Sequence, residues 1–162
     1  MKEEDEIPYF EDEGNGLKPG VPIVERDTIH AIVYDPRTDQ ALCLDWGKFS
    51  WKTFVTGGIE NGEDPITTAL REIKEETGYK NLKFLANLGK TRAGYYADHK
   101  KENRIANGTE LLFELLNDEQ DKVQNPEELP HTFKWIPRNE VLSFLTPNSQ
   151  KYIWELAQKY LP

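Results

Sequence analysis

Three glutamates, Glu72, Glu75 and Glu76, follow a pair of adjacent glycines, Gly57 and Gly58, in the stretch GGIENGEDPITTALREIKEETGY. An α-helix turns by about 100° per residue, so offsets of three and four residues bring the three carboxylates to one side. Like charges one turn apart destabilise a helix by about 0.2–0.5 kcal/mol per pair. Adjacent glycines let backbone carbonyls approach a ligand, and Mg²⁺ takes carboxylates together with water and substrate phosphates. The spacing therefore predicts a hard-cation site.

The alternative interpretation is a solvated helix face, on which Arg71 pairs with Glu75 at the next turn and relieves some of the repulsion. Two features favour the metal site over this alternative. Glu76 borders the apolar arc of the helix, so we expect it to be only half exposed, and the glycine loop leaves the backbone open. The apolar arc consists of Ile66, Ala69, Leu70 and Ile73.

The same stretch resembles the Nudix box. The matching residues are Gly57, Glu63, Arg71, Glu72, Glu75, Glu76 and Gly78. The one departure is Tyr79, where the family usually has an aliphatic residue. Outside the box, residues 135–141 (WIPRNEV) resemble the late tryptophan strand and helix start of the family, so that the resemblance extends over about residues 25–162.

The resemblance implies an α/β fold, a Nudix-type α/β/α sandwich with a mixed central sheet. It also implies Mg²⁺- or Mn²⁺-dependent hydrolysis of a nucleoside diphosphate linked to another moiety, as in a nucleotide sugar, ADP-ribose or a nucleoside triphosphate-like substrate. Carried over by residue, Glu72, Glu75, Glu76 and the carbonyl next to Gly57 bind the metal, and Arg71 and Glu63 orient the helix and loop. Structural support of the box is expected from Glu63, Gly58 and Gly78.

The family often uses a further acid outside the box as base or extra ligand. Glu127 and Glu128 are the first candidates here, and Asp118, Glu119 and Glu102 are weaker ones. Aromatic residues could stack on a base or belong to the core, namely Trp46, Trp51, Tyr95 and Tyr96. The basic residues and histidine of residues 92–104 could meet substrate or form a solvated loop, namely Arg92, His99, Lys100, Lys101 and Arg104. We interpret His30, inside the apolar run TIHAIV, as structural.

The bulk composition limits the other functions. The net charge of -9 is concentrated at the N-terminus, where residues 1–16 hold seven acids and one lysine. This balance argues against general nucleic-acid binding, which needs a basic stripe. No apolar run is long enough to cross a membrane, and the N-terminus lacks the apolar core of a signal peptide. The single cysteine, Cys43 in ALCL, fits a buried structural thiol and a reducing compartment. We therefore expect a cytoplasmic protein with a small nucleotide-like partner, and leave a homodimer open.

Two regions are expected along the chain: residues 1–22 as an acidic flexible tail, and residues 23–162 as a single Nudix domain. Strands are predicted at residues 28–34, 41–46, 52–56, 81–88, 109–116 and 133–136. Residues 91–106 are expected to form a strand and a mobile loop. The main helix should begin after the capping residue Asp64 and end at Gly78, with a short helix around 140–144 and a last helix after Pro147.

A non-catalytic, accessory Nudix-fold module is the alternative function. Residues 24–36, 41–65 and 75–84 also resemble, more faintly, the Nudix-like module found in some bacterial leucyl-tRNA synthetases. A module that has lost catalysis would be expected to lose glutamates of the box. All of them are present here, which favours the enzyme.

Overall fold

The computed structural model describes residues 6–98, 100–123 and 131–162. The strands are β1 (Tyr9–Glu11), β2 (Ile23–Asp35), β3 (Gln40–Asp45), β4 (Lys52–Thr53), β5 (Val55–Gly58), β6 (Leu82–Ala97), β7 (Glu102–Leu115) and β8 (Thr132–Pro137). The α-helices are α1 (Pro65–Thr77), α2 (Val141–Phe144) and α3 (Asn148–Ala157). Short 3₁₀ turns are η1 (Gly47–Phe49), η3 (Arg138–Glu140) and η4 (Gln158–Tyr160).

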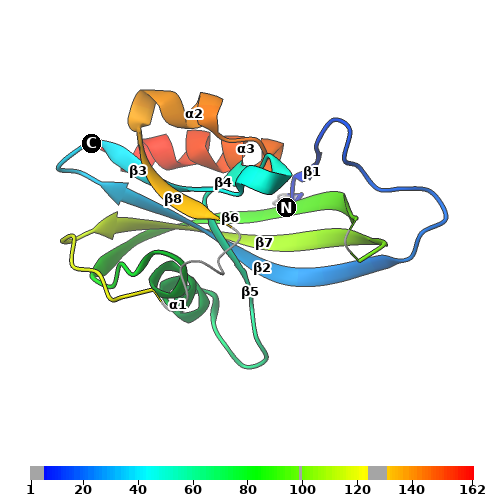
Figure 1. Ribbon diagram of the computed structural model, residues 1–162, viewed down its shortest axis with the longest axis horizontal. Helices are drawn as coiled ribbons and strands as arrows, with labels where there is room; N and C mark the ends of the chain where they lie inside the picture. Colours follow the sequence, from blue (N-terminus) through cyan, green and yellow to red (C-terminus); the bar gives the residue numbers. More distant parts are fainter. Residues whose placement is uncertain (1–5, 99, 124–130) are drawn as a thin grey trace, which may run out of the picture.

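The strands form one mixed sheet with helices on both faces (Figure 1). Its order is β1-β6-β7-β2-β3-β4, while β5 pairs with β2 and β8 pairs with β3. The β2–β7 and β1–β6 pairs are parallel and the other pairs are antiparallel. Helix α1 covers one face, and α2 and α3 cover the other. The predicted α/β/α sandwich with a mixed central sheet is confirmed.

Strand β2 shows why the layers form. Its residues alternate between faces, so Ile29, Ala31 and Val33 pack under α1, whereas Ile32 and Tyr34 pack under α3. A strand that is covered on both faces is continuously apolar rather than alternating. The same burial explains the run ALCL in β3.

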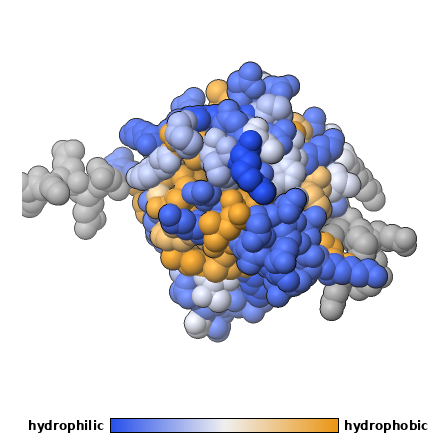
Figure 2. Space-filling model, turned by 90° about the vertical axis from the view of Figure 1, so that its left-hand side faces the viewer, coloured by the Kyte–Doolittle hydropathy of each residue, from blue (hydrophilic) through white to orange (hydrophobic). Residues whose placement is uncertain are grey.

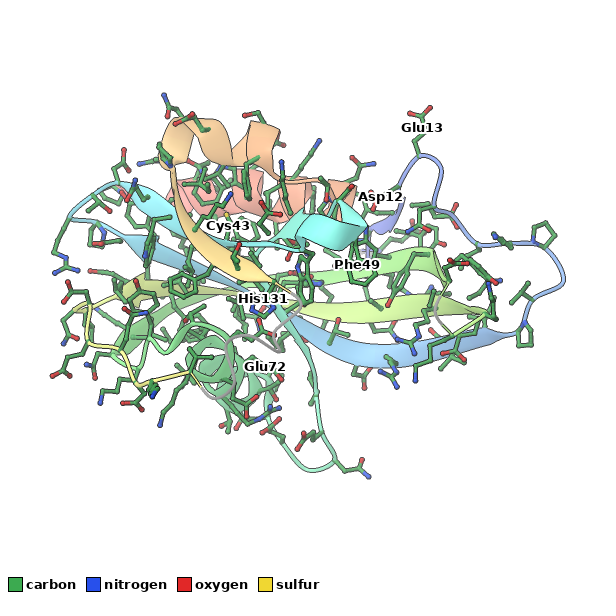
Figure 3. The ribbon with its side chains drawn as sticks, in the orientation of Figure 1. Asp12, Glu13, Cys43, Phe49, Glu72 and His131 are labelled. Atoms are coloured by element: carbon green, nitrogen blue, oxygen red, sulfur yellow. The ribbon has the colours of Figure 1, made fainter. Side chains whose placement is uncertain are left out.

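Cys43 lies in the layer between the sheet and α3, on the opposite side from Glu72 of α1 (Figure 3). Its side chain is fully buried, and burial raises the pKa of the thiol to about 12. A thiol with so high a pKa is inert. The interpretation of Cys43 as a structural residue agrees with this position.

Helix α1 begins and ends where the sequence predicts. The Asp64 Oδ1 atom accepts a hydrogen bond of 3.0 Å from the Thr67 backbone N–H, and Pro65 occupies the first turn. Gly78 ends the helix at φ 85° and donates its N–H to the Lys74 carbonyl at 2.8 Å. A Cβ at Gly78 would overlap the Asp121 carbonyl oxygen. Glycine is therefore required here both for the positive φ and for the space beside Asp121.

The hairpin of β6 and β7 is longer than expected. The predicted strand at residues 109–116 lies within β7, but residues 91–97 and 102–106 are also strands, with Ala97 opposite Glu102. The strand expected within residues 91–106 is therefore present and occupies more of this range than expected, while the mobility of the expected loop stays a prediction. Polar residues fill these strands because part of the sheet face carries no helix, so the apolar pattern that identifies a strand is absent there.

The N-terminal segment also departs from expectation. Tyr9–Glu11 forms β1, which pairs in parallel with Arg92, Ala93 and Gly94 of β6. Asp12 Oδ1 then accepts the Asn148 backbone N–H at 2.9 Å. A three-residue strand with acidic neighbours has no apolar pattern that would predict it from the sequence. It forms because the edge of β6 offers backbone groups with which it can pair. The boundary between residues 22 and 23 stays a prediction.

The surface at one end of the molecule shows an apolar area bordered by hydrophilic side chains (Figure 2). In the part of the chain that the structure describes, no helix has both the length and the apolar character needed to cross a membrane. The homodimer and the cytoplasmic location stay predictions.

We predict that Asp64→Ala lowers the free energy of unfolding by about 1 kcal/mol, because the Thr67 N–H at the start of α1 loses its acceptor. For a chain of this size the melting temperature should fall by about 2–4 °C. Asp64→Asn is the matched control, since its side-chain oxygen can still accept, and it should melt close to wild type in calorimetry. Equal losses in both variants would refute the capping role.

Candidate active site

Arg71 joins the glycine-rich loop to helix α1. Its Nε and Nη2 atoms donate to the two carboxylate oxygens of Glu63 at 3.0 and 2.9 Å. These hydrogen bonds from Arg71, together with one from Thr68 Oγ1, lower the pKa of Glu63 to about 2. A bidentate arginine–carboxylate pair fixes orientation as well as distance. This geometry is what the orienting role expected for Arg71 and Glu63 requires.

The same guanidinium faces the glutamate cluster. Arg71 Nη1 lies 2.9 Å from Glu72 Oε1 and 3.3 Å from Glu75 Oε2. The pairing of Arg71 with Glu75, expected from their spacing, is therefore present. One cation offsets part of the repulsion among the carboxylates, so the helix tolerates three glutamates on one side.

Gly57 is the contact point between the loop and the helix. A Cβ at this position would overlap the Cγ and Cδ atoms of Glu72, so only glycine leaves room for that carboxylate. The Glu72 side chain is 14 % exposed, and burial is the main cause that raises the pKa of Glu72. At Gly58, in contrast, a Cβ would meet open space. The structural support expected from Gly58 stays a prediction, because its side-chain position is unrestricted.

Glu76 carries the least compensated charge of the cluster. Its Oε2 atom is buried and has no hydrogen-bond partner among the described residues. Burial first, and then the carboxylates of Glu72 and Glu75, raise the pKa of Glu76 to about 8. A buried carboxylate without a partner is unfavourable until it binds a proton or a cation.

The donor set fits a hard divalent cation. Carboxylates from Glu72, Glu75 and Glu76, and the backbone carbonyl beside Gly57, are the oxygen ligands that Mg²⁺ and Mn²⁺ accept. Among the described residues, no group of three or more His, Cys, Asp or Glu side chains is already disposed to hold a metal. Arg71 holds two of the three carboxylates instead, so water and substrate phosphates have to supply part of the coordination shell. The metal site stays a prediction.

The candidate bases outside the box do not approach the cluster in the described residues. Glu127 and Glu128, the first candidates, lie outside the described residues. Glu119 accepts a hydrogen bond from Asn81 at 2.9 Å, beyond the end of α1, and Asp118 is exposed beside it. Glu102 pairs with Arg104 at 2.9 Å at the start of β7.

Tyr79 links the end of the box to the tryptophan strand. It is 6 % exposed and stacks edge-on against Phe133 and Trp135, with ring centroids 5.9 and 5.4 Å away. The Trp135 Nε1–H donates to the Tyr79 hydroxyl at 2.8 Å. The departure from an aliphatic residue is therefore matched by a hydrogen-bonded aromatic cluster with β8.

A cavity of about 270 Å³ lies on the other side of Gly57, between the sheet, the N-terminal segment and the start of α3. Three of the aromatic residues singled out in the sequence line it, namely Trp46, Trp51 and Tyr95. Tyr96 does not, because successive side chains of a strand point to opposite faces, and its ring lies 3.8 Å from Lys18 Nζ instead. Figure 3 shows Asp12 of the cavity wall and Glu72 of the cluster on opposite sides of the sheet.

Of the basic residues of residues 92–104, only Arg104 lines the cavity. Arg92 pairs with Glu25 at 2.9 Å and Lys101 with Asp98 at 3.3 Å, both near the surface, while Lys100 is exposed. His99 lies outside the described residues.

Sequence reasoning missed several residues of the cavity wall, namely Phe10, Asp12, Arg26 and Thr28, and treated His30 as structural only. The available signal was His30, a polar residue inside the apolar run of β2, on the same face of the strand as Arg26 and Thr28. His131 was also without an assigned role. It is buried against the Trp46 ring at 4.8 Å between centroids, and burial lowers its pKa.

The raised pKa of Glu76 predicts how stability changes with pH. The folded state binds this proton more tightly than the unfolded chain, whose glutamates titrate near 4.5. The contribution is full below pH 4.5 and is lost as pH rises through about 8. In chelator, the wild-type melting temperature should therefore fall between pH 5 and 8 more steeply than that of Glu76→Gln. Glu63, with its lowered pKa, acts in the opposite direction but only below this window. Parallel slopes would contradict the assignment.

The comparisons with solved structures show the fold. A MutT protein from Bacillus halodurans is 24 % identical with a TM-score of 0.57, and the match covers 84 % of this chain and 85 % of that one. The Ap4A hydrolase of C. elegans is 17 % identical with a TM-score of 0.57, covering 85 % and 96 %. The dihydroneopterin triphosphate pyrophosphohydrolase of E. coli is 17 % identical with a TM-score of 0.60, covering 85 % and 97 %.

The family follows from the sequence itself. No curated protein sequence matches the chain, and the resemblance to a module of leucyl-tRNA synthetases stays a prediction. The family model for the NUDIX domain matches residues 24–156, which is most of the chain and includes the whole glutamate helix and its loop. The predicted family and enzyme class are thereby confirmed: the chain belongs to the NUDIX family of hydrolases.

Proposed function

We propose that this protein hydrolyses a phosphoanhydride bond in a nucleoside diphosphate that is linked to another moiety, with Mg²⁺ or Mn²⁺ as cofactor. The observation that carries the proposal is the buried, unpartnered oxygen of Glu76, which lies beside Glu72 where that side chain packs on Gly57. An enzyme that handles a diphosphate needs such carboxylates, because they recruit the cation that neutralises the phosphates.

The structural relatives support the class of substrate. Two of them are named for phosphoanhydride compounds, Ap4A and dihydroneopterin triphosphate. Both compounds join a heterocyclic group to a chain of phosphates. The shared fold makes the same class of bond our proposal for this chain.

We assign the following roles to the residues of the chain. The cofactor would be held by Glu72, Glu75, Glu76 and the carbonyl beside Gly57, and when bound it would supply charge neutralisation and a lowered pKa of water. Arg71 and Glu63 keep the loop and the helix in one orientation. Water would then attack one phosphorus and release its proton to solvent, the P–O bond of the anhydride would break, and the other phosphate would leave with the electron pair.

One observation favours a non-catalytic binding module as the alternative. Arg71 occupies Glu72 and Glu75, and no metal-ready group is preassembled among the described residues. A module that binds a nucleotide without turnover would need no more than this. The presence of every acid of the box argues for the enzyme, and turnover separates the two functions.

We predict that phosphate-releasing or nucleotide-releasing activity appears with one class of a substrate panel and is lost in Glu75→Gln. The panel holds ADP-ribose, nucleotide sugars, dinucleoside polyphosphates and nucleoside triphosphates, each with Mg²⁺ and with Mn²⁺. Glu155→Gln, an exposed glutamate of α3 outside the site, is the matched control and should keep full activity.

Full activity in Glu75→Gln would show that the metal assignment is wrong. If the wild-type protein releases no product from any substrate of the panel, and its melting temperature nevertheless rises with Mg²⁺, the binding module would be favoured.

A further inference from the structure

Strand β5 presents Gly57 to Glu72, although the strand specifies its own register only weakly. It is four residues long, ends in two glycines and, among the described residues, pairs with β2 alone. Glycine-rich strands are prone to slip, and a slip of one residue turns every side chain to the other face. A slip in one direction would bring Thr56 to this point, where its Cβ would overlap the Glu72 side chain. The register of β5 therefore has to be fixed from outside the strand.

Phe54 is the residue at which the chain changes its neighbour in the sheet. The preceding strand β4 pairs with β3, whereas β5 pairs with β2, and Phe54 lies between the two strands. Phe54 is fully buried, and a buried backbone N–H that lacks a partner is unfavourable. The partner here is a side chain of α3, because Gln150 Oε1 accepts the Phe54 N–H at 2.7 Å. A side chain thus takes the place of a neighbouring strand at this bend.

Gln150 is itself held in place at the start of α3. It is 3 % exposed and lies in the first turn of the helix. Asp12 Oδ1 accepts the backbone N–H of Asn148, the first residue of this turn, at 2.9 Å. Just before the helix, Thr146 donates its N–H to the Lys52 carbonyl at 3.0 Å and accepts the Lys52 N–H on its Oγ1 at 3.1 Å. The start of α3 is therefore a fixed reference point for the chain between β4 and β5.

The side chain of Phe54 is fixed by the same helix. Its ring centroid lies 5.9 Å from that of Trp154, which follows Gln150 by four residues on the same side of α3. The backbone and the side chain of Phe54 are thus both held by one helix face. Helix α3 and the glutamate helix α1 cover opposite faces of the sheet, so the connection from α3 to the cluster runs through the strand between them (Figure 1).

We propose that Gln150 is a positioning residue of the candidate active site. By holding Phe54 it fixes the register of β5, and this register places Gly57 and the carbonyl beside it against Glu72. Gly57 follows Phe54 by three residues, about 10 Å along an extended chain, so Gln150 acts through the strand. The inference rests on the proposed function, because a cation at this carbonyl is part of that function.

The alternative is that the hydrogen bond from Phe54 to Gln150 contributes to the stability of the fold alone. Both interpretations predict that Gln150→Met, which keeps the length of the side chain and removes the acceptor, lowers the melting temperature by about 2–10 °C. They differ at Gly57, where only the positioning role predicts a local change in the folded protein. Gln150 also lines the cavity, so both tests of the positioning role omit nucleotides.

The first test measures hydrogen exchange of the backbone amides of residues 55–58 by NMR, in chelator. Gln150→Met should speed their exchange about tenfold relative to wild type, because β5 loses an anchor. Gln158→Met is the matched control, since Gln158 Oε1, directly after α3, accepts a hydrogen bond of 2.9 Å from Arg138 Nε. This control should leave the exchange of residues 55–58 unchanged. Gln150→Glu, which keeps an oxygen acceptor for the Phe54 N–H, should also exchange as the wild type does.

The second test measures the affinity for Mn²⁺ from the electron paramagnetic resonance of the free ion. Gln150→Met should weaken binding about 10-fold to 100-fold, the usual effect of removing a group that orients metal ligands. Gln158→Met and Gln150→Glu should bind Mn²⁺ as the wild type does.

Wild-type exchange or wild-type Mn²⁺ affinity in Gln150→Met would overturn the inference and leave the hydrogen bond a role in stability alone. Equal effects of Gln150→Met and Gln158→Met would overturn it too, and so would a loss in Gln150→Glu as large as that in Gln150→Met. The proposed function fails separately, if the wild-type protein binds no divalent cation or hydrolyses nothing, since the exchange of residues 55–58 still tests the position of β5.

Discussion

The guanidinium of Arg71 holds together two parts of the chain that would otherwise separate, a glycine-rich loop and a helix face with three like charges. Its Nε and Nη2 atoms donate two hydrogen bonds to Glu63, and its Nη1 atom donates to Glu72 and Glu75. One cation cannot neutralise all of these carboxylates, and Glu76 is left with a buried, unpaired oxygen. The helix is therefore stable enough to form, while one carboxylate oxygen of the cluster stays without a partner among the described residues. That residual imbalance is what connects the fold to the metal-dependent function that we propose.

Gly57 is the second constraint, because it belongs to two sites at once. From the side of α1 its missing side chain admits Glu72, and from the other face of the sheet it lines the cavity with His30 and Trp51. The glutamate cluster and the cavity are thus separated by the thickness of one strand.

The sequence predicted what local patterns determine. The residues of the box predicted the helix, its cap at Asp64 and its end at Gly78, and the apolar runs predicted the central strands. It could not predict β1 or the full length of β6 and β7, because those strands exist through pairing with neighbours rather than through their own apolar pattern. His30 shows the same limit: its ring is held by Glu110, which is 80 residues away in the chain. Of the acids proposed as bases, Glu127 and Glu128 lie outside the described residues, and the role of every candidate stays a prediction, because a single surface acid carries no local pattern that locates it.

The central claim is that a divalent cation binds where the loop meets the glutamate helix. Paramagnetic broadening of backbone amide signals by substoichiometric Mn²⁺ tests it most directly, since broadening reports distance from the ion without requiring a substrate. We predict that the amides of Gly57, Gly58, Glu72 and Glu76 broaden first, and that Glu76→Gln weakens the effect. Broadening centred on the acidic residues 11–13 of the N-terminal segment, with the glutamate helix unaffected, would contradict the account.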